Sequence, residues 1–136
     1  MDLDVARTFV THHHHAVLAT RRSDGEPQLS PVTVTTDGSG RLVISSRQSA
    51  YKVRNLRRDP RASICVMTNA FFGQWIQADG TATIIDLPDA MDLLVDYYRR
   101  ASGEHPDWDE YRTVMQQENR VIIRMDITRA GPDKSG

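Results

Sequence analysis

A run of fifteen residues near the middle of the chain holds the side chains best suited to bind an anion. Residues 47–61 carry six cationic side chains and one carboxylate, that of Asp59. Three serine hydroxyls lie close to the beginning of this run: Ser45 and Ser46 directly precede it, and Ser49 is its third residue. Hydroxyls, the unpaired amides at a helix start and a nearby ammonium group together form a general phosphate receptor. The sequence therefore predicts an anion site, with Lys52 as its point charge and Arg47 as its guanidinium fork.

Two other interpretations of this run stay open. Lys52 is one of only two lysines, and the other, Lys134, lies in the C-terminal tail. The run also fits a solvated amphipathic helix, with Val53 and Leu56 packed inward and the arginines in water. Binding of nucleic acid ranks lower, because no aromatic residues are interleaved with these cations. We expect a small-molecule anion and no nucleic acid.

Metal and nucleophile chemistry have weaker support in the sequence. Residues 12–15 are four histidines, but adjacent helical side chains point about 100° apart and do not converge on one ion. Cys65 lies in a predicted strand, where a buried, inert thiol is the usual outcome. We expect no metal site. Trp75, Phe71 and Phe72 either line a pocket for a flat ring or pack in the core.

Composition places these residues in one folded domain. The chain has 136 residues, of which 39% are hydrophobic and 26% charged, and its formal net charge is -1. These values exclude a disordered chain and a general nucleic-acid binder. The sequence contains no apolar run of membrane-spanning length and no cationic start typical of a signal peptide. A single cysteine fits a reducing compartment, so we expect a cytoplasmic protein without a membrane partner.

The elements that must position the site follow from periodicity and turn signals. The predicted helices cover 2–14, about 50–58 after a Ser49 cap, 89–101, and Asp107 to Glu118. The predicted strands cover 16–20, 28–36, 41–46, 63–68, 75–85 with a bend at Asp79-Gly80, and a half-buried 121–128. Six antiparallel strands with inserted helices indicate an α+β protein, mainly β, built on a closed or partly closed barrel. Neither common phosphate-loop motif is present. We expect one domain over 1–130 and a disordered tail over 131–136.

Several motifs resemble one known family. They are A-V-L-A-T (16–20), D-G-x-P-Q-L-S-P-V (24–32), Y-K-V-R-N-L-R-R-D-P-R-A-S (51–63), F-F-G-x-W (71–75), D-G-T-A (79–82) and G-E-H-P-D-W-D-E-Y (103–111). Together they resemble the deazaflavin-using branch of the pyridoxamine 5'-phosphate oxidase-like proteins, whose fold is a split β-barrel similar to FMN-binding barrels. The resemblance runs from about the first strand to the last.

This resemblance implies a homodimer with coenzyme F420, or FMN as the runner-up, in a groove at the subunit interface. It places the cofactor phosphate on Lys52 and on Ser45 or Ser46. The residues that it places along the ring system are Gln28, Ser30, Pro31, Val32 and Thr33. Asn55 and nearby arginines, including Arg47 and Arg57, would flank the phosphate, and Trp75 would close the aromatic side. The arginines would also suit a polyglutamate tail.

The chemistry implied by the resemblance is hydride transfer from the reduced deazaflavin to an unsaturated or conjugated small molecule. In such an enzyme the protein supplies position and exclusion of water, and no proton donor is identified. One alternative is an FMN enzyme of the pyridoxamine phosphate oxidase type, although its usual R-x-V-L-L-K stretch is not recognisable. Another is a carrier that binds the cofactor without turnover.

Overall fold

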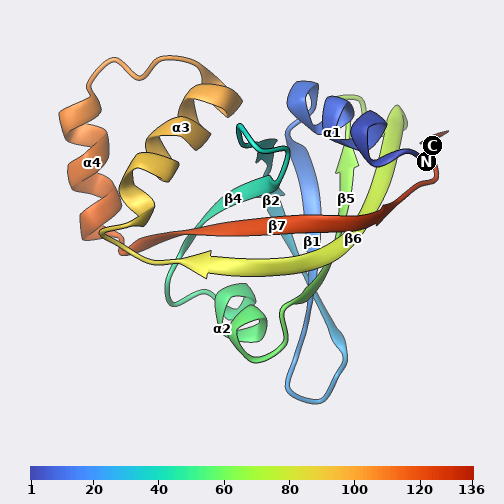
Figure 1. Cartoon of the computed structure of the whole chain (residues 1–136), viewed down its shortest axis with the longest axis horizontal. Coiled ribbons are helices and arrows are strands. Elements are labelled where there is room, and N and C mark those ends of the chain that lie inside the picture. Colours follow the sequence, from blue (N-terminus) through green and yellow to red (C-terminus); the bar gives the residue numbers. More distant parts are fainter.

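The computed structural model describes all 136 residues and contains four helices and eight strands (Figure 1). The helices are α1 (Leu3–His12), α2 (Tyr51–Arg58), α3 (Ala90–Ser102) and α4 (Trp108–Gln117). The strands are β1 (His15–Arg21), β2 (Pro27–Thr33), β3 (Thr35–Thr36), β4 (Leu42–Arg47), β5 (Arg61–Met67), β6 (Gln74–Ile85), β7 (Arg120–Ala130) and β8 (Lys134–Ser135). The mixed α+β class predicted from the sequence is confirmed.

One antiparallel sheet forms the framework. Its strands are bonded in the order β2-β1-β5-β6-β7-β4-β3, and β8 pairs with β6. The long strands β6 and β7 curve across the molecule (Figure 1). No ladder joins β2 to β4, so the curled sheet is a half-barrel that is open between these two strands.

The predicted count of six strands is wrong at two places. The predicted strand over 28–36 divides at Val34. The side chain of Val34 is buried, and its backbone N–H donates a hydrogen bond of 2.8 Å to the carbonyl of His14. The chain therefore bends here, from pairing with β1 to pairing with β4. The C-terminal tail also differs from the disordered segment expected, because Lys134 and Ser135 pair with the start of β6. The bend expected at Asp79-Gly80 is confirmed as a shift in the β6–β7 register.

Alternating side chains of the sheet bury the main core. Leu18, Ile64 and Ile76 point inward, α1 adds Val10, and α2 adds Val53. This contact confirms that the apolar side of the predicted helix at 50–58 faces the core. The predicted cap is wrong: Ala50 precedes α2, and no side chain bonds to the first amides. The Asp107 cap of α4 is confirmed by its bond to the amide of Glu110.

A second apolar cluster covers the other face of the sheet at β4 and β7. Val43 and Ile122 pack there against Leu94 and Val95 of α3. Ile122 is fully buried, so the prediction that β7 is buried on one face only is wrong for its first half. The sequence predicts helices α3 and α4 but not that they pack over this strand. These helices supply the extra burial.

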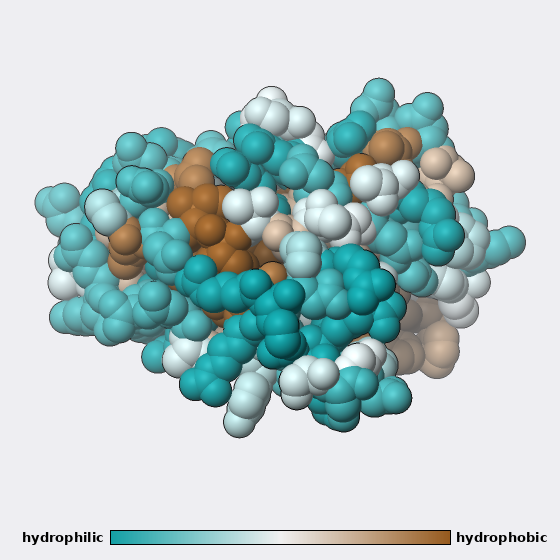
Figure 2. All heavy atoms as spheres, turned by 60° about the horizontal axis from the view of Figure 1, so that its bottom comes forward, coloured by the Kyte–Doolittle hydropathy of each residue, from teal (hydrophilic) through white to brown (hydrophobic).

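The outer faces of β1 and β5 stay partly exposed, because burial alternates along both strands. This outer face also includes Leu29 of β2, which is 65% exposed and pairs with Ala19. Figure 2 shows another face, largely hydrophilic, with its largest hydrophobic area on the side where Figure 1 places α3 and α4. None of the four helices has both the length and the hydrophobicity needed to cross a bilayer.

Candidate anion and cofactor site

Lys52 lies in the first turn of α2 and has no ion-pair or hydrogen-bond partner. Its side chain is half-buried. Burial and then the positive charge of Arg120 lower the pKa of the Lys52 ammonium group. A desolvated ammonium group without a counter-ion is costly, and an anion placed beside it would remove part of that cost.

Two arginines extend this positive region. Arg47 and Arg120 are cross-strand partners of β4 and β7, and both point to one carboxylate. Glu118 accepts a bond of 2.8 Å from Arg120 Nε and lies 3.5 Å from a terminal nitrogen of Arg47. The hydrogen bond from Arg120 lowers the pKa of Glu118, so this carboxylate is ionised at neutral pH. The two arginines therefore share one carboxylate, while Lys52, which feels the charge of Arg120, has none, so the region keeps a positive charge.

The two serines of β4 lie on opposite faces, as consecutive strand residues must. Ser46 is 1% exposed, and its hydroxyl donates to the carbonyl of Arg47 at 3.0 Å. Ser45 is partly exposed on the side of Tyr97 and its hydroxyl has no partner. Of the two serines expected to hold a phosphate, Ser45 has the free hydroxyl.

Tyr97 of α3 lies at the opening of the half-barrel. Its hydroxyl donates to the carbonyl of Thr33, the last residue of β2, at 2.9 Å. Burial raises the pKa of this hydroxyl, while a backbone hydrogen bond from Ser45 and the charge of Arg120 partly oppose the shift. Tyr97 therefore connects the end of β2 with the free edge of β4. The sequence analysis missed this residue.

Asn55 joins α2 to the first two strands. Its side-chain nitrogen donates to the hydroxyl of Thr20 and to the side-chain oxygen of Gln28, each at 3.0 Å. Its oxygen accepts from Arg58 at 3.1 Å. Asn55 is only 5% exposed. Its observed contacts position the helix against the sheet.

The residues predicted to flank a ring system lie along the edge strand β2. Three of them line a shallow cavity of about 430 Å³ on the outer face of the sheet, whose lining is His15, Ala16, Val17, Pro31, Val32, Thr33 and Met67. Trp75 pairs with Met67 and so lies next to this cavity. Gln28 is at the other end of β2, beside Asn55. Strand β2 thus runs from the α2 end of the molecule to this cavity, with Ser30 between them.

The cationic run is less isolated than the sequence implies. A guanidinium nitrogen of Arg57 lies 2.7 Å from a carboxylate oxygen of Asp86, directly after β6. A guanidinium nitrogen of Arg61 lies 2.8 Å from a carboxylate oxygen of Asp59. Asp59 is the one carboxylate within 47–61, but Asp86 and Glu118 from later elements also pair with cations of this run. Arg120 and Glu118 lie more than sixty residues along the chain from Lys52, and no local spacing connects them to the site.

The remaining candidates do not converge. His12 and His14 bond separately to the carbonyls of Thr8 and Val34, and no group of three or more potential ligands is placed to hold a metal ion. Phe71 and Phe72 form an edge-to-face pair that is 80% and 74% exposed, so neither packs in the core. Burial raises the pKa of the Cys65 thiol.

Comparisons with known proteins agree with this fold. A family model described as pyridoxamine 5'-phosphate oxidase matches residues 3–132. The structure of conserved hypothetical protein Rv2991 from Mycobacterium tuberculosis is 27% identical, with a TM-score of 0.76 over 96% of this chain and 82% of that one. An F420 reductase is 21% identical, with a TM-score of 0.70 over 92% of this chain and 94% of that one. A heme binding protein from Mycobacterium smegmatis is 20% identical, with a TM-score of 0.73 over 98% of this chain and 57% of that one.

Proposed function

This chain belongs to the pyridoxamine 5'-phosphate oxidase family, and we propose that it is an oxidoreductase that uses coenzyme F420 to reduce a conjugated small molecule. The family includes oxidoreductases and binds flavin-like cofactors. The choice of F420 rests on the motifs at 51–63 and 103–111 together with the similar fold of an F420 reductase.

The unpaired ammonium of Lys52 is the observation that carries this proposal. A half-buried cation without a partner that feels the charge of Arg120, which shares one carboxylate with Arg47, has the chemistry of a phosphate receptor. The residues therefore fit a phosphate-bearing cofactor. The free hydroxyl of Ser45 supports the same assignment, because hydroxyls bond readily to phosphate oxygens.

The chain's own residues then have distinct tasks. Lys52 and Arg47 would hold the phosphate by charge, and Asn55 would keep α2 fixed against β1 and β2. The side chains of Pro31, Val32 and Thr33 would flank the ring system and exclude water. The bound deazaflavin would supply hydride chemistry to an unsaturated substrate, while the protein supplies position.

We also propose a homodimer formed through the outer face of the sheet. Leu29 is exposed there, and Val17, Pro31, Met67 and Trp75 stay partly exposed or exposed because no helix of this chain covers them. A second copy on this face would enclose the shallow cavity beside β2 and complete a cofactor groove. Sedimentation equilibrium with Leu29→Asp tests this: the variant should be monomeric where the parent is a dimer.

Fluorescence titration with F420 and, in parallel, with FMN tests the cofactor assignment. F420 should bind more tightly, and Lys52→Ala should weaken it by about 1.5–3 kcal/mol, or roughly 10- to 150-fold in Kd. Arg54→Ala is the matched control, because Arg54 lies on the same helix with its side chain exposed over Tyr51. Unchanged affinity in Lys52→Ala would remove the phosphate assignment.

Two alternatives give different results in the same experiments. Tighter binding of FMN would assign the groove to a flavin enzyme of this family. F420 binding without turnover of any acceptor, in an assay of reduced F420 over a panel of quinones and other conjugated compounds, would identify a carrier.

A further inference from the structure

The opening of the half-barrel is bridged by one side-chain hydroxyl. No ladder joins β2 to β4, and β3 covers the edge of β4 only at Leu42 and Val43. The hydroxyl of Tyr97 donates to the carbonyl of Thr33 at the end of β2, at 2.9 Å, and a backbone hydrogen bond from Ser45 of β4 reaches the same hydroxyl. We propose that Tyr97 is a positioning residue, which takes the place of the missing ladder and fixes the distance between the two walls of the cofactor groove.

The peptide group that joins Thr33 to Val34 is held from both sides. Its carbonyl accepts from Tyr97, and its N–H donates to the carbonyl of His14 at 2.8 Å. The imidazole of His14 also donates, from Nδ1, to the carbonyl of Val34 at 2.8 Å, because a carbonyl oxygen can only accept. The residue that precedes β1 therefore holds one side of this corner, and Tyr97 holds the other.

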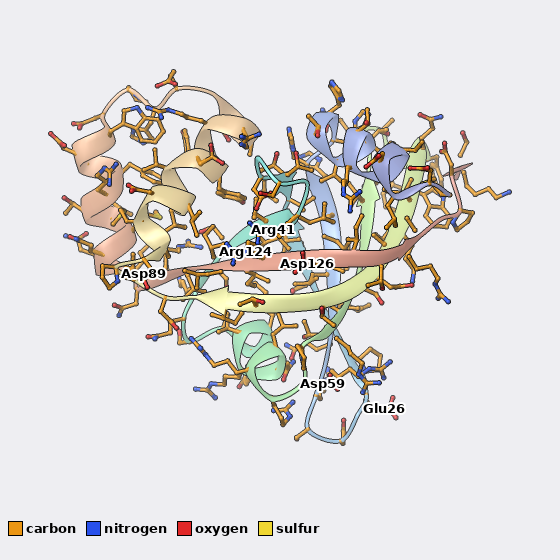
Figure 3. The ribbon with its side chains drawn as sticks, in the orientation of Figure 1. Glu26, Arg41, Asp59, Asp89, Arg124 and Asp126 are labelled. Carbon is orange, nitrogen blue, oxygen red and sulfur yellow. The ribbon has the colours of Figure 1, made fainter.

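Tyr97 belongs to a helix that is firmly packed on the rest of the sheet. Leu94, one turn earlier on α3, is fully buried in the same cluster as Ile122 of β7. Arg124 lies two residues after Ile122 and so on the same face of β7, toward α3 (Figure 3). Because α3 is anchored to β4 and β7, the bond from Tyr97 to Thr33 fixes the end of β2 relative to these strands.

The two walls that Tyr97 connects have different tasks in the proposed function, on which this inference rests. Ser45 and Lys52 are proposed to hold the phosphate, whereas Val32 and Thr33 at the end of β2 are proposed to flank the ring. A ligand that contacts both walls depends on the distance between them. A ligand that occupies only the phosphate region does not. The bridge should therefore matter for the whole cofactor and not for phosphate alone.

Tyr97→Phe tests this inference, because it removes the hydroxyl and keeps the ring. Fluorescence titration of the full chain should show F420 binding roughly three- to tenfold weaker than in the parent, the range expected for one lost neutral hydrogen bond. Inorganic phosphate, titrated at constant ionic strength and followed by NMR at the amide of Val53, should bind both proteins equally. Lys52→Ala should instead weaken the binding of both ligands.

Tyr111→Phe is the matched control. The Tyr111 hydroxyl also donates to a backbone carbonyl, that of Leu94 at 2.8 Å, but it connects no strands. Each variant thus loses one bond from a tyrosine hydroxyl to a carbonyl, and Tyr111→Phe should bind F420 as the parent does. In the ligand-free chain, hydrogen exchange at the amide of Val34 should be faster in Tyr97→Phe and unchanged in Tyr111→Phe.

Three results would overturn the inference. The first is equal F420 affinity in Tyr97→Phe and Tyr111→Phe, and the second is a loss of phosphate affinity in Tyr97→Phe that matches its loss of F420 affinity. The third is unchanged exchange at Val34 in Tyr97→Phe. Failure of the proposed function would differ from all three, because the parent would not bind F420, and the exchange measurement, made without ligand, would still test the bridge.

Discussion

The side-chain nitrogen of Asn55 donates a hydrogen bond of 3.0 Å to the side-chain oxygen of Gln28, which connects α2 to the edge strand β2. The same nitrogen donates to Thr20, which is 1% exposed. A single buried amide thus fixes the helix that carries Lys52 to the strand that would flank the cofactor ring. The proposed site therefore depends on this amide even without direct contact between Asn55 and a ligand.

Asn55→Ala should lower the free energy of unfolding by about 1–3 kcal/mol, because it leaves the buried Thr20 hydroxyl without this partner. Urea denaturation measures the loss. Asn69→Ala, at an exposed loop position, should change stability by less than about 0.5 kcal/mol. Equal stabilities of Asn55→Ala and the parent would show that the amide does not fix the helix.

Lys52→Met should not destabilise the ligand-free protein. Burial and Arg120 lower the pKa of Lys52, so the unfolded chain binds this proton more tightly than the folded chain, and the charge costs folding free energy. Thermal melts should give a Tm equal to that of the parent or up to about 4 °C higher. A clear drop in Tm would mean that the ammonium has a stabilising partner in the folded chain.

Gly80→Ala should prevent stable folding or cost at least about 3 kcal/mol, because a Cβ at this position would overlap the carbonyl oxygen of Asp126 in β7. Gly38→Ala is the control, since its Cβ would meet only the end of the Arg100 side chain, at an ordinary 3.5 Å. Chemical denaturation of both variants checks the difference. A stable Gly80→Ala protein would contradict the close approach of β6 and β7 at the bulge.

Stability should fall as the pH rises from about 10 to about 12. Burial, and then the nearby Tyr97, raise the pKa of Tyr111 from 10.0 to about 12, and its hydroxyl donates to the carbonyl of Leu94 at 2.8 Å. In this interval the unfolded chain loses the proton first, so alkali favours unfolding. Tyr111→Phe should flatten the slope in urea denaturation across this range. Tyr51→Phe, at an exposed position, should leave the slope unchanged.

Local patterns in the sequence predict most of the elements. Alternation identifies β1 and β5, Gly80 marks the bend in β6, and Asp107 marks the start of α4. These features follow from residues within a few positions of one another. The break at Val34 could not be predicted in the same way, because the His14 carbonyl that bends the chain lies twenty residues earlier.

The sequence predicted only part of the candidate site. Lys52 and Arg47 are conspicuous in a run of cations, but Arg120 and Glu118 reach them only through the pairing of β4 with β7. Tyr97 shows in the sequence only as part of an amphipathic helix, and its bond to Thr33 depends on where α3 packs. Sheet order decides these contacts, and composition and spacing do not determine sheet order.

The position of β7 in the sheet also governs when the sheet can finish folding during synthesis. β4 has only the two-residue β3 as a neighbour until β7 pairs along its whole length, and β7 begins 73 residues after β4 ends. Pairings so distant in sequence are closed late, because the intervening loop loses much conformational entropy. A nascent chain that stops before residue 120 therefore exposes an unpaired edge of β4 and the apolar side chains that β7 would cover. Closure of the half-barrel must wait until β7 has left the ribosome.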